Sequence, residues 1–396
     1  MRIAGLLSIA GIVLLIGRPA FLLTAAWLDD RHDRTQTRAG WVDDASRMEA
    51  ARAAEIVVLP AARDEAEAKL REVLARARAD HLQVSIAGAR HTMGGQTIAP
   101  DGLAIEMLPF RSLELDEAAR LLTAGAGARW SEILPYLDAR GLSVSVMQSN
   151  DDFTVGGSLS ANCHGWQCLR PPIASTVESL RLMLADGSIV RCSRTENAEL
   201  FSLVLGGYGL FGIILDATLR VVPDERYARD ARILPAARYS ESFRERVGDD
   251  ARMAYGRLCV APGEAFLKEA ILTVFESSPG EIVPLGEEVT GTTLRRIVYR
   301  AQRGSAAGKE LRWFAERTFR TGLDTGCFSR NGLLQDPAAV YAEENDDRSD
   351  ILHEYFVPIA RAEKFLEQVR VVVPRFAVDL MNVTVRDVKE DVDSFL

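Results

Sequence analysis

The sequence predicts an α+β protein built from about two globular units. Its 396 residues are more than one typical core requires. A strand, a helix and a second strand open the folded part, and the pattern then turns to β structure. After residues 222–224 strands and helices are mixed and glycine is less frequent, so we predict domains at residues 50–224 and 225–396.

Local patterns define the expected elements of the first unit. Leu70, Val73 and Leu74 share one helical face, and Asp186-Gly187 is a strong hairpin signal between two strand-like runs. The expected strands are residues 56–59, 83–87, 102–107, 120–124, 142–147, 177–184, 188–192 and 213–222. The expected helices are residues 63–79, 130–139 and 197–205.

The second unit is less regular in its sequence. Residues 329–350 are polar and predict a loop, and glycines at 304 and 308 predict a break within a helical stretch. The expected strands are residues 252–260, 267–275, 351–359 and 377–387, and the expected helices are residues 292–320 and 361–369. The chain stops at Leu396 without a capping element, so we expect this unit to be truncated.

The N-terminus differs in kind from the rest of the chain. Residues 3–16 are apolar or small, Arg18-Pro19 interrupts them, and residues 20–28 resume the apolar run. We predict that residues 1–28 anchor the protein in a bacterial-type inner membrane, with a cleaved signal peptide as the alternative. The polar residues 29–49 that follow are expected to be a linker.

Charge near the apolar run favours one orientation of the anchor. More arginines follow the run than precede it, which places the folded part in the cytoplasm, although neighbouring aspartates leave the periplasmic side open. The net charge of -9 argues against nucleic acid as a partner. Five cysteines at irregular spacing fit neither a disulfide framework nor a zinc site, so we expect free thiols and no metal.

Residues 86–96 form the stretch of the sequence that indicates a ligand site most clearly. They follow a predicted strand and read Ile-Ala-Gly-Ala-Arg-His-Thr-Met-Gly-Gly-Gln. The glycines let backbone amides approach a ligand closely, while the arginine, histidine and threonine add a cation, an imidazole and a hydroxyl. This combination suits a bound diphosphate, and the alternative is a polar loop whose glycines only serve turns.

A second glycine segment, residues 153–166, strengthens this interpretation. Its small and hydrogen-bonding residues suit contact with a flat or phosphorylated ligand, and a buried turn is the alternative. Residues 207–212 match G-x-G-x-x-G, but a helix precedes them and a strand follows, which is the reverse of a Rossmann dinucleotide site. No Walker lysine motif, H-E-x-x-H or G-x-S-x-G occurs.

Together these three ordered motifs resemble the FAD-binding (PCMH-type) domain of the vanillyl-alcohol oxidase and p-cresol methylhydroxylase superfamily. The similarity is strong over residues 50–224, and the nearest branches are the alditol and aldonolactone oxidases and the decaprenylphosphoryl-ribose oxidases. In the second unit, residues 354–358 and 382–386 resemble strands of the alditol-oxidase substrate domain. The resemblance implies a two-subdomain FAD-binding domain followed by a substrate (cap) domain with a mainly antiparallel sheet.

The resemblance also assigns residues to the cofactor. Residues 87–92 would wrap the FAD diphosphate, residues 154–165 would line the flavin, and residues 207–214 would pass its adenosine side or ring edge. The implied contacts are Gly88, Ala89, Arg90, His91, Thr92, Gly95, Thr154, Gly156, Gly157, Ser158, Asn162, His164, Gly165, Gly212 and Ile214. His91 lies where many members attach FAD covalently through histidine, and a non-covalent polar contact is the alternative.

The resemblance has departures in the second unit. The related oxidases carry a glutamate two residues before an arginine in a late strand, and here these positions hold Thr384 and Arg386. We take Arg386 and Asn382 as candidate catalytic residues; pairing with a carboxylate is the alternative role of Arg386. The segment that carries a catalytic side chain in relatives would lie beyond Leu396, so the catalytic base is open.

The function implied is an FAD-dependent oxidoreductase that oxidises a CH–OH group of a sugar, alditol or lactone-like small molecule. Hydride would pass to the flavin, and O2 or a membrane electron carrier would be the second substrate. Two alternatives stay open. One is a membrane-tethered flavin-binding protein without turnover, and the other is an FAD-dependent double-bond reductase.

Overall fold

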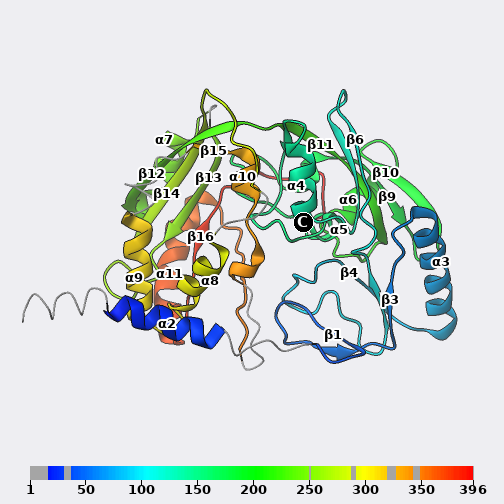
Figure 1. Cartoon of the computed structure of the whole chain (residues 1–396), viewed down its shortest axis with the longest axis horizontal. Coiled ribbons are helices and arrows are strands. Elements are labelled where there is room, and N and C mark those ends of the chain that lie inside the picture. The colour runs from blue at the N-terminus through cyan, green and yellow to red at the C-terminus, as the bar shows by residue number, and fades with distance from the viewer. Residues whose placement is uncertain are drawn as a thin grey trace, which may run out of the picture.

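The computed structural model in Figure 1 describes residues 17–30, 37–248, 251–286, 291–318, 327–341 and 348–395. Helices and strands separate into two units that share no sheet, which confirms the predicted α+β fold. Strand β11 (Ile213–Pro223) is the last strand of the first unit, and β12 (Arg226–Pro235) is the first strand of the second unit. The boundary between them lies where the sequence becomes poorer in glycine.

The first unit begins with a parallel β-α-β arrangement. Strand β3 (Glu55–Val58) is followed by helix α3 (Arg63–Asp80) and strand β4 (Val84–Ala87), and β5 (Leu103–Glu106) pairs in parallel between the two strands. The apolar side chains at helical spacing on α3 are buried, as the sequence predicts. The glycine loop therefore leaves the carboxyl end of β4, where open α/β sheets hold ligands.

A larger antiparallel sheet completes the first unit. Its strand order is β10-β9-β11-β7-β6, and β8 pairs with the end of β11. The predicted hairpin is confirmed, because Met183 of β9 lies opposite Ile189 of β10. The strands are β6 (Leu113–Asp116), β7 (Leu121–Gly125), β8 (Leu142–Val144), β9 (Val177–Met183) and β10 (Ile189–Ser193). The helices are α4 (Trp130–Asp138), α5 (Val155–Ser160) and α6 (Ala198–Val204).

The second unit is built on a five-stranded antiparallel sheet in the order β15-β12-β14-β13-β16. Helices lie against this sheet (Figure 1). The further strands are β13 (Ala251–Leu258), β14 (Glu269–Ser277), β15 (Cys327–Ser329) and β16 (Thr384–Val385). The helices are α7 (Tyr239–Arg246), α8 (Thr292–Arg300), α9 (Ala306–Thr318), α10 (Arg330–Leu334) and α11 (Ala362–Arg375). The predicted break between α8 and α9 is confirmed.

One hydrophobic core runs across the junction between the two units. Tyr227, Met253 and Tyr255 of the second sheet belong to the same buried cluster as the first unit's strands and helices. A separate buried cluster forms between the second sheet and helices α7 and α11. Because the shared core closes the junction, groups from both units are held against one another there.

Two strands predicted in the second unit are wrong. Residues 351–358 have no regular structure and are almost all exposed, and residues 377–387 form a strand only at β16. Their apolar residues gave a strand-like pattern, but a strand also needs a partner, and β16 pairs only at Arg257 and Gly256. Before these two stretches, the polar residues 329–350 contain α10 instead of being loop throughout.

The residues predicted as a linker pack against the first unit. Strands β1 (Trp41–Val42) and β2 (Ala51–Arg52) pair with one another, and Val42 is buried against Ala104 of β5. Before them, helix α2 (Arg18–Asp30) lies against α8 and α9. The predicted anchor falls mostly on residues 1–16, which lie outside the described residues.

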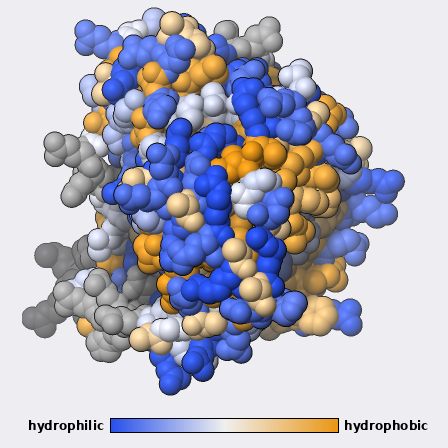
Figure 2. Space-filling view, turned by 90° about the vertical axis from the view of Figure 1, so that its right-hand side faces the viewer, coloured by the Kyte–Doolittle hydropathy of each residue, from blue (hydrophilic) through white to orange (hydrophobic). Residues whose placement is uncertain are grey.

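Among the described residues, no helix combines the length and apolar character that crossing a membrane requires. Figure 2 shows the side of the molecule that the first unit forms, where polar side chains cover much of the surface and apolar ones gather in patches between them. Such a mixture is ordinary for a folded globular unit.

Candidate functional site

The glycine loop after β4 and the segment that opens α5 touch one another at Gly88. A Cβ atom at position 88 would lie 2.1 Å from Thr154 Oγ1, so only glycine fits there. His91 stacks on Phe153 with ring centroids 4.4 Å apart and planes 10° apart. The structure therefore brings the two predicted cofactor segments together into one site.

The amides of the loop divide into two groups. Gly94 N and Gly95 N donate to Asp44 Oδ2 at 3.2 and 2.9 Å, and Thr92 Oγ1 donates to the same oxygen at 3.0 Å. In the described part of the chain, the amides of residues 89–91 have no hydrogen-bond partner. One half of the loop thus binds a carboxylate from the chain itself, and the other half leaves donors open to a ligand.

Two other predicted residues of this loop also have partners. Arg90 has a positive φ of 56° and its Nη2 atom donates to Glu106 Oε1 at 2.8 Å, so its charge is balanced within the protein. The backbone carbonyls of Arg90 and Thr92 accept from Ala45 N. The loop is therefore held in shape from outside by residues 44–45 and 106.

His91 is largely buried between the loop and residues 152–153. Burial lowers the pKa of its imidazole, and this effect prevails over the Asp152 carboxylate, which acts in the opposite direction. The ring is therefore neutral at neutral pH and keeps a lone pair. A neutral imidazole beside a flavin is the form that can act as a nucleophile.

Helix α5 places small residues at the site and is held in position by its cap and by buried contacts. Thr154 Oγ1 caps the helix by accepting from Gly157 N at 3.3 Å, and Gly156 leaves no room for a Cβ because Ala126 lies 2.9 Å away. Ser158 is fully buried, where its hydroxyl accepts from Trp130 Nε1 and donates to Gln148 Oε1, each at 2.8 Å. Ser158 thus fixes α5 to Trp130 and Gln148.

Asn162 is tied to the end of the chain. Its Nδ2 atom donates to Asp391 Oδ2 at 2.9 Å and to Ser394 Oγ at 2.7 Å, while its Oδ1 atom accepts from Ala174 N at 3.1 Å. Phe395 packs edge-on against Phe211 at 5.9 Å. The structure therefore uses the Asn162 side chain to join residues 391–395 to the first unit.

The third predicted segment lies within the first unit's sheet. Gly212 has a φ of 145°, and a Cβ there would lie 2.8 Å from Met183 O. Ile214 pairs with Leu182 of β9 and is buried. Both residues serve the close approach of β11 to β9.

A polar cluster forms where the second unit meets the end of the α5 segment. His164 Nε2 lies 3.1 Å from Glu354 Oε1, Arg386 Nη2 donates to the same carboxylate oxygen, and Arg386 Nη1 donates to His164 O at 3.3 Å. Next to His164, Gly165 approaches Met147 O so closely that a Cβ would lie 2.1 Å away. His164 and Arg386, predicted separately, are thus brought into contact.

Thr384 and Asn382, which also lie near the C-terminus, have surroundings different from those of Arg386. Thr384 Oγ1 accepts from Arg257 Nη1 at 3.1 Å, and Arg257 forms a buried ion pair with Glu316 at 3.1 Å. Asn382 Oδ1 is buried and has no hydrogen-bond partner in the described ranges. The structure does not join Asn382 to Arg386 by any hydrogen bond it records.

A separate buried carboxyl beside the site predicts a pH-dependent stability. Burial, with Asp152 and Asp336 nearby, raises the pKa of Asp151 to about 7. Because this folded-state pKa exceeds the unfolded value, the group stabilises the fold below about pH 4, and that contribution is lost as pH rises to about 7. We expect Asp151→Asn to raise the free energy of unfolding by about 2 kcal/mol near pH 8 and to change it little near pH 4.

Urea unfolding at both pH values checks this expectation. The exposed Asp101 supplies a matched control, since Asp101→Asn removes a charge from a position without a neighbouring buried carboxyl. An equal gain for Asp151→Asn at both pH values would contradict the assignment, because the gain would then not come from a titrating carboxyl.

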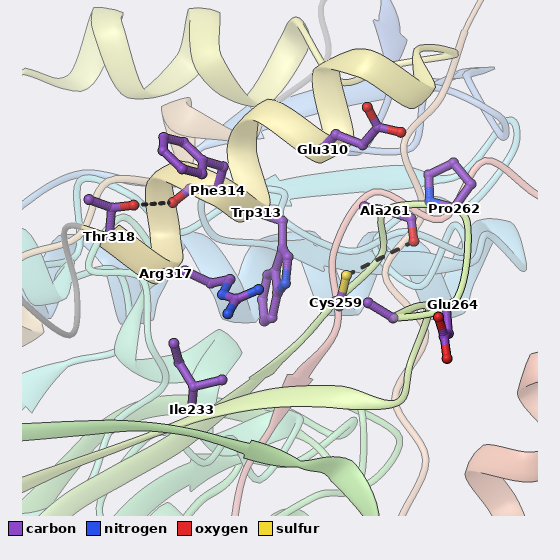
Figure 3. Close-up of a pocket in the computed structure, with 11 residues that line it drawn as sticks. Ile233, Cys259, Ala261, Pro262, Glu264, Glu310, Trp313, Phe314, Arg317 and Thr318 are labelled. Atoms are coloured by element: carbon purple, nitrogen blue, oxygen red, sulfur yellow. Dashed lines mark hydrogen bonds between the residues drawn. The ribbon is translucent and has the colours of Figure 1, made fainter.

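A cavity of about 660 Å³ opens in the second unit (Figure 3). It lies between helix α9, strand β12 and the residues that follow β13. Trp313, Phe314 and Arg317 of α9 line it together with Ile233 and Cys259. Burial raises the pKa of the Cys259 thiol to about 11, so the thiol stays protonated. None of the predicted site residues lines this cavity.

The residues of the glycine loop fit FAD. The open amides of residues 89–91 supply donors for a diphosphate, and the close contact of Gly88 with Thr154 brings the loop against the α5 segment without side-chain bulk. His91 and Phe153 form a stacked pair against which a flat ring system could pack. When bound, FAD would supply the hydride acceptor.

Sequence reasoning missed two residues of this site. Asp44 lay in the stretch predicted as a linker, and only the need of the loop amides for an acceptor could have pointed to it. Glu354 was part of a motif that indicated a strand, and a single glutamate carries no signal of a partner more than a hundred residues away. The four described cysteines outside β15 are free, as predicted.

Comparison with known proteins finds similarity to an FAD-binding domain in the first unit. Residues 54–193 match the family described as FAD binding domain. The chain is similar to L-gulonolactone oxidase of Mus musculus, with 34% identity over 156 residues, which is 39% of this chain and 35% of that protein. It is also similar to cytokinin dehydrogenase 2 of Oryza sativa subsp. japonica, with 32% identity over 167 residues, 40% of this chain and 30% of that protein.

An uncharacterized oxidoreductase from the fasciation locus of Rhodococcoides fascians is 30% identical over 183 residues, 45% of this chain and 40% of that protein. The matches thus span between 30% and 40% of the length of these three relatives. The family match at residues 54–193 lies within the first unit, and the second unit lies outside it.

Proposed function

Given that this chain carries an FAD-binding domain of the PCMH type and binds FAD, we propose that it oxidises a CH–OH group of a sugar, alditol or lactone-like substrate. The proposal is supported most directly by the cluster of His164, Glu354 and Arg386 at the junction of the two units. A hydroxyl group brought to this cluster would meet both a hydrogen-bond donor and an acceptor. L-gulonolactone oxidase, by its name, acts on a sugar lactone, which agrees with this substrate class.

Each part of the site has a distinct task in this proposal. The loop of residues 88–92 holds the diphosphate, α5 keeps the flavin side free of bulky groups, and the second unit presents the polar cluster. FAD, when bound, would supply the acceptor for the hydride of the substrate carbon. The protein supplies orientation, excludes water and takes up the hydroxyl proton.

The experiment that tests the proposal starts from the purified full-length protein. We expect a yellow protein, or one that becomes yellow with FAD, whose flavin absorbance bleaches under anaerobic conditions with D-sorbitol or L-gulono-1,4-lactone as the probe. Readmission of O2 or of a quinone identifies the second substrate. A protein that takes up no FAD at all would refute the proposal.

We also propose that FAD is attached covalently through His91. The neutral, half-buried ring stacked on Phe153 supports this, because its lone pair is available for bond formation. We expect trichloroacetic acid to precipitate the flavin with the wild-type protein, whereas His91→Ala releases it into the supernatant. The exposed His81 provides the control, since His81→Ala should leave the flavin in the pellet. Flavin released from the wild-type protein would exclude the bond.

A flavin-binding protein without turnover is the second candidate. It is favoured by Thr384, which faces Arg257 at the position where the related oxidases carry a glutamate. Absence of bleaching with every alditol, sugar and lactone probe, in a protein that holds FAD, would select this candidate. Bleaching by an external reductant followed by reoxidation with an activated alkene would instead select a double-bond reductase.

The membrane attachment also stands as a proposal. Its support is the apolar composition of residues 3–16, and it would place O2 or a membrane electron carrier within reach of the flavin on the cytoplasmic side. Alkali extraction of membranes with protease protection tests it. Complete release of the protein by alkali would reject the anchor.

A further inference from the structure

The cluster at the junction is formed by side chains that come from both units. His164 follows α5 in the first unit, whereas Glu354 and Arg386 belong to the second unit. The His164 side chain is 9% exposed and the Glu354 side chain is 41% exposed, so the cluster runs from the buried junction to its surface. Such a contact forms only when both units are in place.

Glu354 is held in its charged form. Burial alone would raise the pKa of its carboxyl, but His164 and Arg386 beside it together hold that pKa below its usual value. Arg386 contacts this carboxylate and also the backbone carbonyl of His164 at 3.3 Å. The guanidinium thus fixes the carboxylate next to the imidazole while leaving a negative charge 3.1 Å from Nε2.

Neither ring nitrogen of His164 has a hydrogen-bond partner among the described residues. Nδ1 is buried and has no hydrogen-bond partner among the residues that the structure describes. Nε2 faces Glu354 at 3.1 Å without being aligned on it as a hydrogen bond, and the Phe356 ring packs edge-on against the imidazole at 5.5 Å. The ring is therefore held by charge and packing, and the buried Nδ1 keeps an unused lone pair or proton site.

Neighbouring groups are poor acceptors for a proton. Burial raises the pKa of the adjacent Cys163 to about 12, so its sulfur keeps its own proton. The carboxylate of Glu354 is occupied by Arg386, and Asn382 has no group that takes up a proton near neutral pH. His164 is thus the group of this cluster best suited to accept a proton.

The geometry points to His164 as the catalytic base, with Nδ1 as the proton acceptor and Glu354 as the residue that positions its ring. This inference rests on the proposed function. In the step, the O–H bond of the substrate alcohol breaks and its proton passes to Nδ1, while the C–H bond breaks and hydrogen leaves with its electron pair to bound FAD. The substrate becomes a carbonyl compound, and Glu354 stabilises the imidazolium that forms.

Anaerobic stopped-flow reduction of the FAD-loaded protein by D-sorbitol and by L-gulono-1,4-lactone tests the catalytic part. We expect His164→Gln to slow flavin reduction by about 100-fold or more at unchanged FAD content. Glu354→Gln should slow it by about tenfold, since it removes one charge next to the imidazole. His353→Gln is the matched control, because His353 is an exposed histidine next to Glu354 that stacks only on Tyr355, and it should reduce at the wild-type rate.

A readout apart from activity separates a positioning role from a structural one. ¹⁵N-histidine NMR, with the His164 signals assigned from the His164→Gln spectrum, reports which ring nitrogen carries the proton. We expect the neutral ring to be protonated at Nε2 in the wild-type protein and to lose this preference in Glu354→Ala. A proton on Nδ1 in the wild-type protein would overturn the inference.

The kinetic outcomes distinguish this inference from the proposed function. If wild-type flavin is reduced and His164→Gln is reduced at the same rate, His164 is not the base although the proposed function stands. If neither probe reduces wild-type flavin in a protein that holds FAD, the proposed function and the inference fall together.

Discussion

Replacing Gly88 by alanine is expected to abolish FAD retention. The new methyl carbon would lie 2.1 Å from Thr154 Oγ1 and 3.0 Å from Thr154 Cγ2, so the glycine loop would be pushed away from the α5 segment. The open amides of residues 89–91 would then miss the diphosphate, because a hydrogen bond weakens steeply with distance and angle. We expect flavin absorbance per mole of purified protein to fall at least tenfold.

The same loop offers a matched control. A Cβ at Gly94 would meet only the flexible Gln96 side chain at 3.0 Å, so Gly94→Ala should keep its FAD. Combining Gly88→Ala with Thr154→Gly removes the clashing atoms and should restore part of the binding. If Gly88→Ala binds as much FAD as the wild-type protein, the two segments do not close on the cofactor in the way described here.

The first unit could be predicted largely because its signals are local. Helix α3 shows its buried face in the spacing of Leu70, Val73 and Leu74, and the Asp186-Gly187 turn fixes the register of β9 against β10. The glycine loop was found from three glycines after a strand. Each of these features depends on residues close together in the sequence, which is where pattern reasoning is strongest.

The second unit and the junction depend on contacts between distant residues. Residues 351–358 have the composition of a strand, yet no neighbour pairs with them, and composition does not reveal the missing partner. Asp44 and Glu354 reach glycine amides and His164 across 50 and 190 residues. Such pairs carry no period or spacing that a single sequence could show, so the cluster of His164, Glu354 and Arg386 appeared only in the structure.

Arg330 also links parts of the chain that are distant in sequence. It opens α10 in the second unit, is 6% exposed, and its Nε atom donates to Val144 O of the first unit at 3.0 Å. Nη1 donates to Tyr227 Oη at 2.9 Å, and Nη2 donates to Ser145 O. One planar group thus joins three acceptors at the junction between the two units, which also carries the cluster of His164, Glu354 and Arg386.

Arg330→Met is expected to lower the free energy of unfolding by about 3 to 5 kcal/mol, since it leaves two buried carbonyls and a tyrosine hydroxyl without their donor. Urea unfolding measures this loss. Arg238→Met, which breaks an exposed ion pair with Glu241, should cost no more than about 1 kcal/mol. Because the junction holds Glu354 and Arg386 against His164, folded Arg330→Met should also retain FAD but reduce it slowly. A wild-type unfolding midpoint for Arg330→Met would mean that the shared core alone holds the two units together.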